Sequence, residues 1–167
     1  RLINQSDITS SVASLDMTDI FSDTFDVYKI VSSNLDGDTT VDLNVNVINS
    51  SGTVSNSNYE YSWYRLRNDS FSDVRSTSAT TWQNGFGQSG TEGASCVAYV
   101  LNPFSSSSYT FMLSQAGGMS GSEGRMIKFI GVHDVKSRVT GLKLTASGGN
   151  LTTGNIAVYG VRNWVYN

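Results

Sequence analysis

The chain has 167 residues, of which 38% are hydrophobic and only 15% are charged, and it carries a formal net charge of −3. This length fits one domain with its own core, and the acidic balance argues against a nucleic-acid-binding surface. No apolar run approaches the roughly 18 residues that a membrane-spanning helix needs. The single cysteine, Cys96, excludes an internal disulfide and is expected to be a small buried side chain.

The first sixteen residues show no clean periodicity, so residues 1–16 are predicted to form a linker or arm. A short helical turn capped by Ser6 and Asp7 is the alternative. Residues 17–162 are expected to form the folded domain, entered by a Phe-rich strand over 17–25. Residues 163–167 are expected to be a tail that packs on a neighbouring copy. Because the chain begins with Arg1 rather than methionine, we expect a fragment or a processed product.

Alternating and apolar segments predict the strands of this domain. The clearest is residues 41–47, where valine and leucine alternate with aspartate and asparagine. Further strands are predicted at 26–33, 59–67, 79–82, 94–101, 108–115, 125–133, 139–146 and 156–161. Residues 68–78 are predicted to be a polar loop, and 84–93 and 116–124 to be two glycine-rich loops. About ten strands, without an amphipathic helix or an internal repeat, predict an all-β antiparallel β-sandwich that is jelly-roll-like.

The last strand-turn-strand segment, residues 139–161, has the clearest punctuation in the chain. Leu142 and Leu144 alternate with polar residues, and Gly148 and Gly149 supply the backbone freedom that a tight reversal requires. The pattern predicts a β-hairpin. Because an isolated two-stranded ribbon is marginal in water, other strands are expected to cover it.

The residues that most often perform catalysis are scarce in this sequence. His133 is the one histidine; it is followed by Asp134, but no Gly-x-Ser-x-Gly elbow supplies a nucleophile, so a surface turn is the expected setting. No His/Cys cluster has zinc-ligand spacing, and the acids lack the spacing of a calcium loop. A polysaccharide-cleaving enzyme needs paired carboxylates across a cleft, and the few glutamates do not indicate one. We therefore predict no catalytic residue, no metal site and no cofactor.

A binding surface needs only loops on a rigid scaffold, and the two glycine-rich loops are the candidates. Within and beside the first of them, the rings of Trp82 and Phe86 are predicted to contact a ligand. Asn84 and Gln88 are predicted to be their hydrogen-bonding partners. Exposed aromatic rings of this kind would suit a carbohydrate, and several lectins have a jelly-roll architecture.

An ordered series of short segments resembles the jelly-roll domains of virion proteins from tailed phages of marine, especially cyanobacterial, hosts. The segments are residues 25–35, 57–61, 84–87, 101–105, 139–144 and 147–160, including Leu101-Asn-Pro-Phe-Ser105 and Ser147-Gly-Gly-Asn-Leu-Thr-Thr-Gly-Asn155. They span most of residues 20–161. Because the shared motifs are strand and turn chemistry, the resemblance transfers no functional residue.

The resemblance implies a structural, non-enzymatic module located in a virion, as a tail fibre, another appendage or a head decoration. It also implies partners among other virion proteins and other copies of the chain, with a homotrimer as the expected assembly. The alternative function is a lectin-like module that attaches the particle to host-surface polysaccharide. The two differ in what they require: exposed aromatic rings beside a groove for the glycan, and a large contact between subunits for the assembly.

Overall fold

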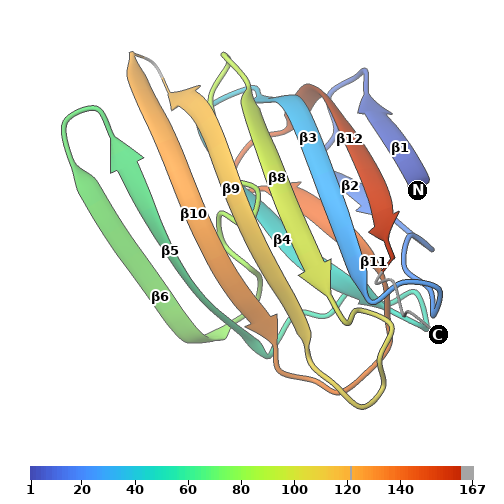
Figure 1. Cartoon of the computed structure of the whole chain (residues 1–167). Coiled ribbons are helices and arrows are strands. Elements are labelled where there is room, and N and C mark those ends of the chain that lie inside the picture. Colours follow the sequence, from blue (N-terminus) through green and yellow to red (C-terminus); the bar gives the residue numbers. More distant parts are fainter. Residues whose placement is uncertain (121, 163–167) are drawn as a thin grey trace.

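The computed structural model of the chain, which describes residues 1–120 and 122–162, is built from antiparallel strands (Figure 1). The strands are β1 (Leu2–Ile8), β2 (Ser14–Met17), β3 (Val27–Gly37), β4 (Val41–Asn49), β5 (Tyr59–Arg67), β6 (Phe71–Ala79), β7 (Gln88–Ser89), β8 (Ala94–Leu101), β9 (Thr110–Ser120), β10 (Glu123–His133), β11 (Val139–Ala146) and β12 (Leu151–Val161). The expected all-β antiparallel sandwich is therefore confirmed, with twelve strands in the described residues.

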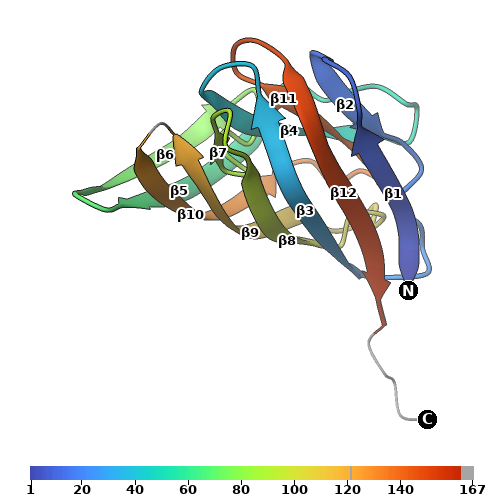
Figure 2. The ribbon, with the colours of Figure 1, turned by 90° about the horizontal axis from the view of Figure 1, so that it is seen from above.

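Two sheets of unequal size form the layers of the sandwich. The large sheet has the order β1-β12-β3-β8-β9-β10-β5-β6, and the small sheet has the order β2-β11-β4-β7. Figure 1 shows the small sheet behind β3, β8 and β12, whereas the end formed by β5 and β6 extends beyond it. Figure 2, turned by 90°, shows the two layers from above. One face of the large sheet thus packs against the small sheet, and we call it the inner face; the opposite face is the outer face.

The core lies between the sheets because each strand that contributes to it alternates buried and accessible positions. On β4, Val41, Leu43, Val45 and Val47 are all buried, as the sequence pattern predicts. Facing strands contribute the fully buried set Tyr28, Ile30, Ala98, Val100, Met112, Leu142, Leu144, Ile156 and Val158. Burying this many apolar side chains is the main stabilising contribution to such a fold.

Four segments differ from the prediction because tertiary pairing overrides weak local patterns. Residues 1–16 are not a linker: β1 pairs with β12 and β2 pairs with β11. The predicted strand over 17–25 is mostly irregular, although it buries Ile20, Phe21 and Phe25 in the core. The predicted loop 68–78 is largely edge strand β6. Of the predicted loop 116–124, residues 116–120 lie in β9 and residues 123–124 lie in β10. The predicted tail, 163–167, lies outside the described residues.

The predicted final hairpin is also wrong in its pairing. The two strands exist, but β11 belongs to the small sheet and β12 to the large one. β11 pairs with β2 and β4, whereas β12 pairs with β1 and β3. The turn around Gly149, which has φ 83°, therefore carries the chain from one layer to the other. A glycine turn permits either path, and the apolar faces of both strands select the one that packs them against each other across the core.

Candidate functional site

The first glycine-rich loop folds into the sandwich instead of projecting from it. Trp82 forms a bridge with Val45, the amide of Phe86 donates to the carbonyl of Leu43 (3.1 Å), and the amide of Leu43 donates to the carbonyl of Gly87 (2.9 Å). The loop thus extends the small sheet past β4, and β7 completes it. The rings it carries consequently enter the core.

The predicted binding rings are completely buried. Trp82 and Phe86 each have 0% exposure. The Trp82 indole lies edge-to-face against Tyr59, with ring centroids 5.4 Å apart, and its Nε1 donates to the carbonyl of Val132 (3.2 Å). A ring with no accessible face cannot stack on a sugar, so the expectation that these two rings contact a ligand is wrong. They are central core residues.

The two predicted polar partners belong to a network centred on Asp42. Asn84 is fully buried and has φ 57°. With its side-chain amide oriented to satisfy both its oxygen and its nitrogen, the nitrogen donates to Asp42 Oδ1 and to the carbonyl of Gly87, both at 3.0 Å. Gln88 Nε2 donates to the same Asp42 oxygen at 2.5 Å, and Gln83 Nε2 donates to Oδ2 at 2.9 Å. Asn84 therefore holds the loop in place. Gln88, which is only partly buried, is the one predicted site residue with access to solvent.

The expectation that His133 lies on a surface turn is wrong. The residue is 2% exposed, at the end of β10. Its Nε2 lies 3.0 Å from Ser55 Oγ, and its ring packs at 4.9 Å from the Tyr59 ring. Its Nδ1 has no hydrogen-bond partner among the described residues. Burial lowers the pKa of His133, and the nearby Asp134 carboxylate partly opposes that effect. This Ser–His contact lacks the third group that would orient the imidazole as a base.

The outer face of the large sheet is the most unusual surface of the molecule. Outward-pointing residues form continuous rows across it, because the registers align residue by residue: Tyr99 lies opposite Leu113, and Leu113 opposite Ile130. Large apolar side chains on this face that are 37–72% exposed are Tyr64, Leu66, Phe71, Val97, Tyr99, Phe111, Leu113, Met119, Met126, Ile130, Tyr159 and Val161. On a sheet with one solvated face, the outward-pointing positions of the strands are normally polar.

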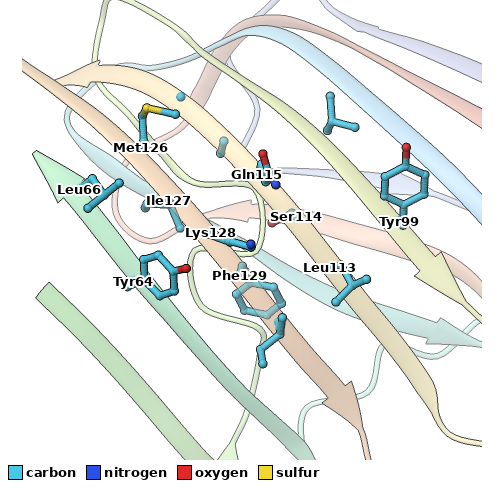
Figure 3. Close-up of a pocket in the computed structure, with 14 residues that line it drawn as sticks. Tyr64, Leu66, Tyr99, Leu113, Ser114, Gln115, Met126, Ile127, Lys128 and Phe129 are labelled. Carbon is cyan, nitrogen blue, oxygen red and sulfur yellow. The ribbon is translucent and has the colours of Figure 1, made fainter. Parts of the chain in front are cut away.

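A shallow groove runs over the middle of this outer face (Figure 3). Its volume is ≈ 880 Å³, and β5, β8, β9 and β10 line it. Tyr64, Leu66 and Met126 lie on one side of the groove, and Tyr99 lies on the other side, with Leu113 between them. A contiguous apolar surface on this scale marks an interaction site. The sequence itself indicates this apolar surface, because many residues that point to either face of β8, β9 and β10 are apolar.

Charged side chains on the outer face are few, and Glu60, Asp73 and Arg75 lie together towards the β6 edge. Lys29 on β3 and Lys128 on β10 belong to neighbouring rows within the apolar area. Glu60 on β5 and Arg75 on β6 line a second, smaller hollow towards the β6 edge. The face therefore has lysines on β3 and β10, and charges of both signs on β5 and β6.

Comparisons with known proteins do not identify this chain: no protein-family model, curated protein or solved structure matches it. In residues 1–120 and 122–162, no three His, Cys, Asp or Glu side chains gather in a way that would hold a metal ion. The same residues contain no helix that is long and apolar enough to cross a membrane.

Proposed function

We propose that this chain is a structural module that works by association, in which the outer face of the large sheet packs on a second copy of the chain. The observation that carries the proposal is the row of exposed apolar side chains across β8, β9, β10 and β5. The hydrophobic effect favours removing such a surface from water. Two twisted sheets pack face to face at about 10 Å, with their strands at roughly 30° to each other.

The size of the apolar area matches a stable interface. If each of the twelve apolar side chains exposes on the order of 80 Å², a fraction of what aromatic residues bury in full, the face offers roughly 1,000 Å². A standard interface buries about 800 Å² per partner, whereas the largest patch on a typical monomer is about 300–600 Å². The outer face thus exceeds what an ordinary monomer exposes and reaches what a dimer needs.

The charges also fit a second copy. A two-fold axis parallel to the strands and running along β9 would place β3 of one copy over β5 of the other, because each lies two strands from β9. That arrangement places Lys29 over Ser62, which is level with it across the sheet, and Glu60 lies two positions along β5. By symmetry the contact occurs twice. Lys128 would lie over β8, where its long stem covers apolar surface while its ammonium group reaches the rim.

The setting that we propose for this module is the virion of a tailed phage, as a fibre, appendage or head-decoration domain. The resemblance of residues 25–35, 101–105 and 139–160 to such domains supports this setting, and virion components assemble as repeated copies. We further propose that the module is not an enzyme. The burial of His133, which keeps its imidazole away from solvent, supports this view.

The association is tested by sedimentation equilibrium of the full chain over a wide concentration range. We expect a concentration-dependent oligomer that dissociates when Leu113→Lys and Ile130→Lys place charges at the centre of the outer face. Ser10→Lys adds the same charge at an exposed position between β1 and β2 and should leave the oligomer intact. The measured stoichiometry distinguishes a two-fold pair from the trimer that the resemblance implies.

A monomer at every concentration, or an oligomer that the two outer-face variants do not weaken, would overturn the self-association. The virion setting has its own test. Mass spectrometry of purified particles from a host that carries the encoding genome should detect the chain at high copy number, and its absence from those particles would refute that setting.

A further inference from the structure

Three of the chain's seven arginines gather on the inner face of the large sheet, beside β7 at the edge of the small sheet. Arg65 and Arg67 come from β5 and Arg125 comes from β10. Arg65 Nη1 and Arg125 Nη1 donate to the same oxygen, Gln88 Oε1, at 2.9 and 3.0 Å. Arg67 and Arg125 also share one oxygen, Glu123 Oε2, at 3.4 and 3.1 Å. We call these three residues the arginine cluster.

The arginine cluster has more donors than acceptors. Arg65 Nε, Arg125 Nε and Trp63 Nε1 are buried and have no hydrogen-bond partner among the described residues. Buried polar atoms are nearly always satisfied, so each unsatisfied one needs an explanation. Arg65 and Arg125 each also donate to Gln88 Oε1, and the Arg65 guanidinium lies over the Trp63 ring, 5.9 Å from its centroid. Unsatisfied donors on these neighbouring side chains are expected where an acceptor group is missing.

The charge balance points the same way. Arg67 and Arg125 are directly opposite each other in the β5–β10 register, and like charges in that position destabilise a sheet. One carboxylate, Glu123, lies between them, and Asp42 accepts a hydrogen bond from Gln88. Burial together with the neighbouring Arg67 and Arg125 charges lowers the pKa of Arg65, and the Asp42 and Glu123 carboxylates partly oppose that effect. In a chain of net charge −3, this is a local surplus of positive charge.

We propose that the arginine cluster is a binding site for a carboxylate-bearing ligand, and that the Glu123 carboxylate occupies the site while the ligand is absent. The Glu123 and Arg67 side chains are the more accessible ones in this ion-pair network, at 33% and 26% exposed, whereas the Arg125 side chain is 13% exposed. The ligand enters from that accessible side, displaces the Glu123 carboxylate, and accepts hydrogen bonds from Arg67 and Arg125. Arginine pairs suit a carboxylate because two parallel N–H groups match its two oxygens.

The site is independent of the outer face, since it lies on the opposite side of the large sheet. Of the four residues that the sequence singles out for ligand binding, Gln88 is the one that touches it. Ser72 on β6 accepts a hydrogen bond from Arg65 at 3.3 Å and limits the site on that side. A carboxylated sugar such as a hexuronate has the anionic group that the arginine pair would bind.

The test is isothermal titration of the full chain with glucuronate, with glucose as the neutral control and sulfate as a second anion. We expect glucuronate to bind and glucose not to bind. Arg125→Gln should weaken glucuronate binding by about 10–100-fold, the loss of a hydrogen bond to a charged group. Arg67→Gln, at the more exposed and weaker contact, should weaken it less. Arg75→Gln removes an arginine from the outer face and should leave binding unchanged.

Glu123→Gln separates a ligand site from a purely structural ion pair. It keeps the shape of the side chain but removes the competing charge, so glucuronate affinity should rise by about tenfold while the melting temperature falls. A purely structural role would make the arginine variants and Glu123→Gln less stable without any glucuronate binding in the unmodified chain. That result, or affinity that falls in Glu123→Gln, would overturn the proposal. Equal affinity for sulfate and glucuronate would overturn the assignment to carboxylates.

Discussion

The two faces of the large sheet have similar apolar side chains but different surroundings. On the inner face, Met112, Phe129 and Val100 are 0–1% exposed because the small sheet and the loop around Trp82 cover them. On the outer face of the same strands, Leu113, Ile130 and Tyr99 are 39–53% exposed. The comparison shows that alternation alone does not tell which face is covered. On β8, β9 and β10 both faces are apolar, which is typical of strands buried on both sides.

The sharpest way to separate the two faces is a matched pair of truncations. Leu144→Ala should lower the free energy of unfolding by about 2–5 kcal/mol, since Leu144 is fully buried between the sheets. Leu113→Ala on the outer face should cost the dilute monomer less than about 1 kcal/mol, because its side chain is 42% exposed and leaves no enclosed cavity. Urea unfolding at low protein concentration measures both. Equal losses would contradict the assignment of the two faces.

Two glycines give the next largest contrast. A Cβ added at Gly131 would lie 2.7 Å from Phe129 Cζ and 2.7 Å from Trp82 Nε1, both in the packed core. Gly131→Ala should therefore destabilise the protein by about 1–3 kcal/mol through overpacking. Gly117→Ala has nothing within 4 Å of the new atom, so thermal melting of the monomer should show no loss. A Gly131→Ala variant as stable as the unmodified protein would show that the core around Phe129 and Trp82 has room for an additional methyl group.

The buried histidine gives the inner face a pH dependence that the outer face lacks. Because burial lowers the folded-state pKa of His133 below its ordinary 6.5, the unfolded chain binds a proton before the folded chain does. The free energy of unfolding should consequently fall as pH drops through about 6.5, and level off below the folded-state pKa of His133. In His133→Phe this part of the pH dependence should disappear. Unfolding curves between pH 7.5 and 5 that run parallel in both proteins would contradict this expectation.

Thiols at the adjacent positions 95 and 96 of β8 should differ in their reactivity, because they point to opposite faces of the large sheet. Cys96 is buried on the inner face, and burial raises its thiol pKa to about 12. It should resist thiol reagents at pH 8 unless the protein unfolds, because the thiolate is the reactive form. Ser95→Cys places a thiol on the exposed outer face of the same strand and should react rapidly in the dilute monomer. Labelling followed by mass spectrometry measures both rates; fast labelling of Cys96 in the folded protein would contradict its burial.

Much of the fold is determined locally by the sequence. The alternation on β4 and β11 sets which side chains face the core, and it predicts the burial of Val45 and Leu144 correctly. The turn residues mark most strand ends, and the sparse charge with abundant Ser, Thr and Asn excludes a helical protein. These properties depend on neighbouring residues, so they can be inferred without knowing the partners of each strand.

Strand partners and the surroundings of each loop depend on contacts between residues far apart in the sequence. Only tertiary structure decides that β11 and β12 lie in different sheets, or that residues 2–8 form a strand, because β1 gains its partner from β12, about 150 residues later. The same holds for Trp82 and Phe86. A glycine-rich segment permits both an exposed loop and a buried one, and pairing with β4 selects the buried path. The arginine cluster likewise arises only when the β5–β10 register sets Arg67 opposite Arg125.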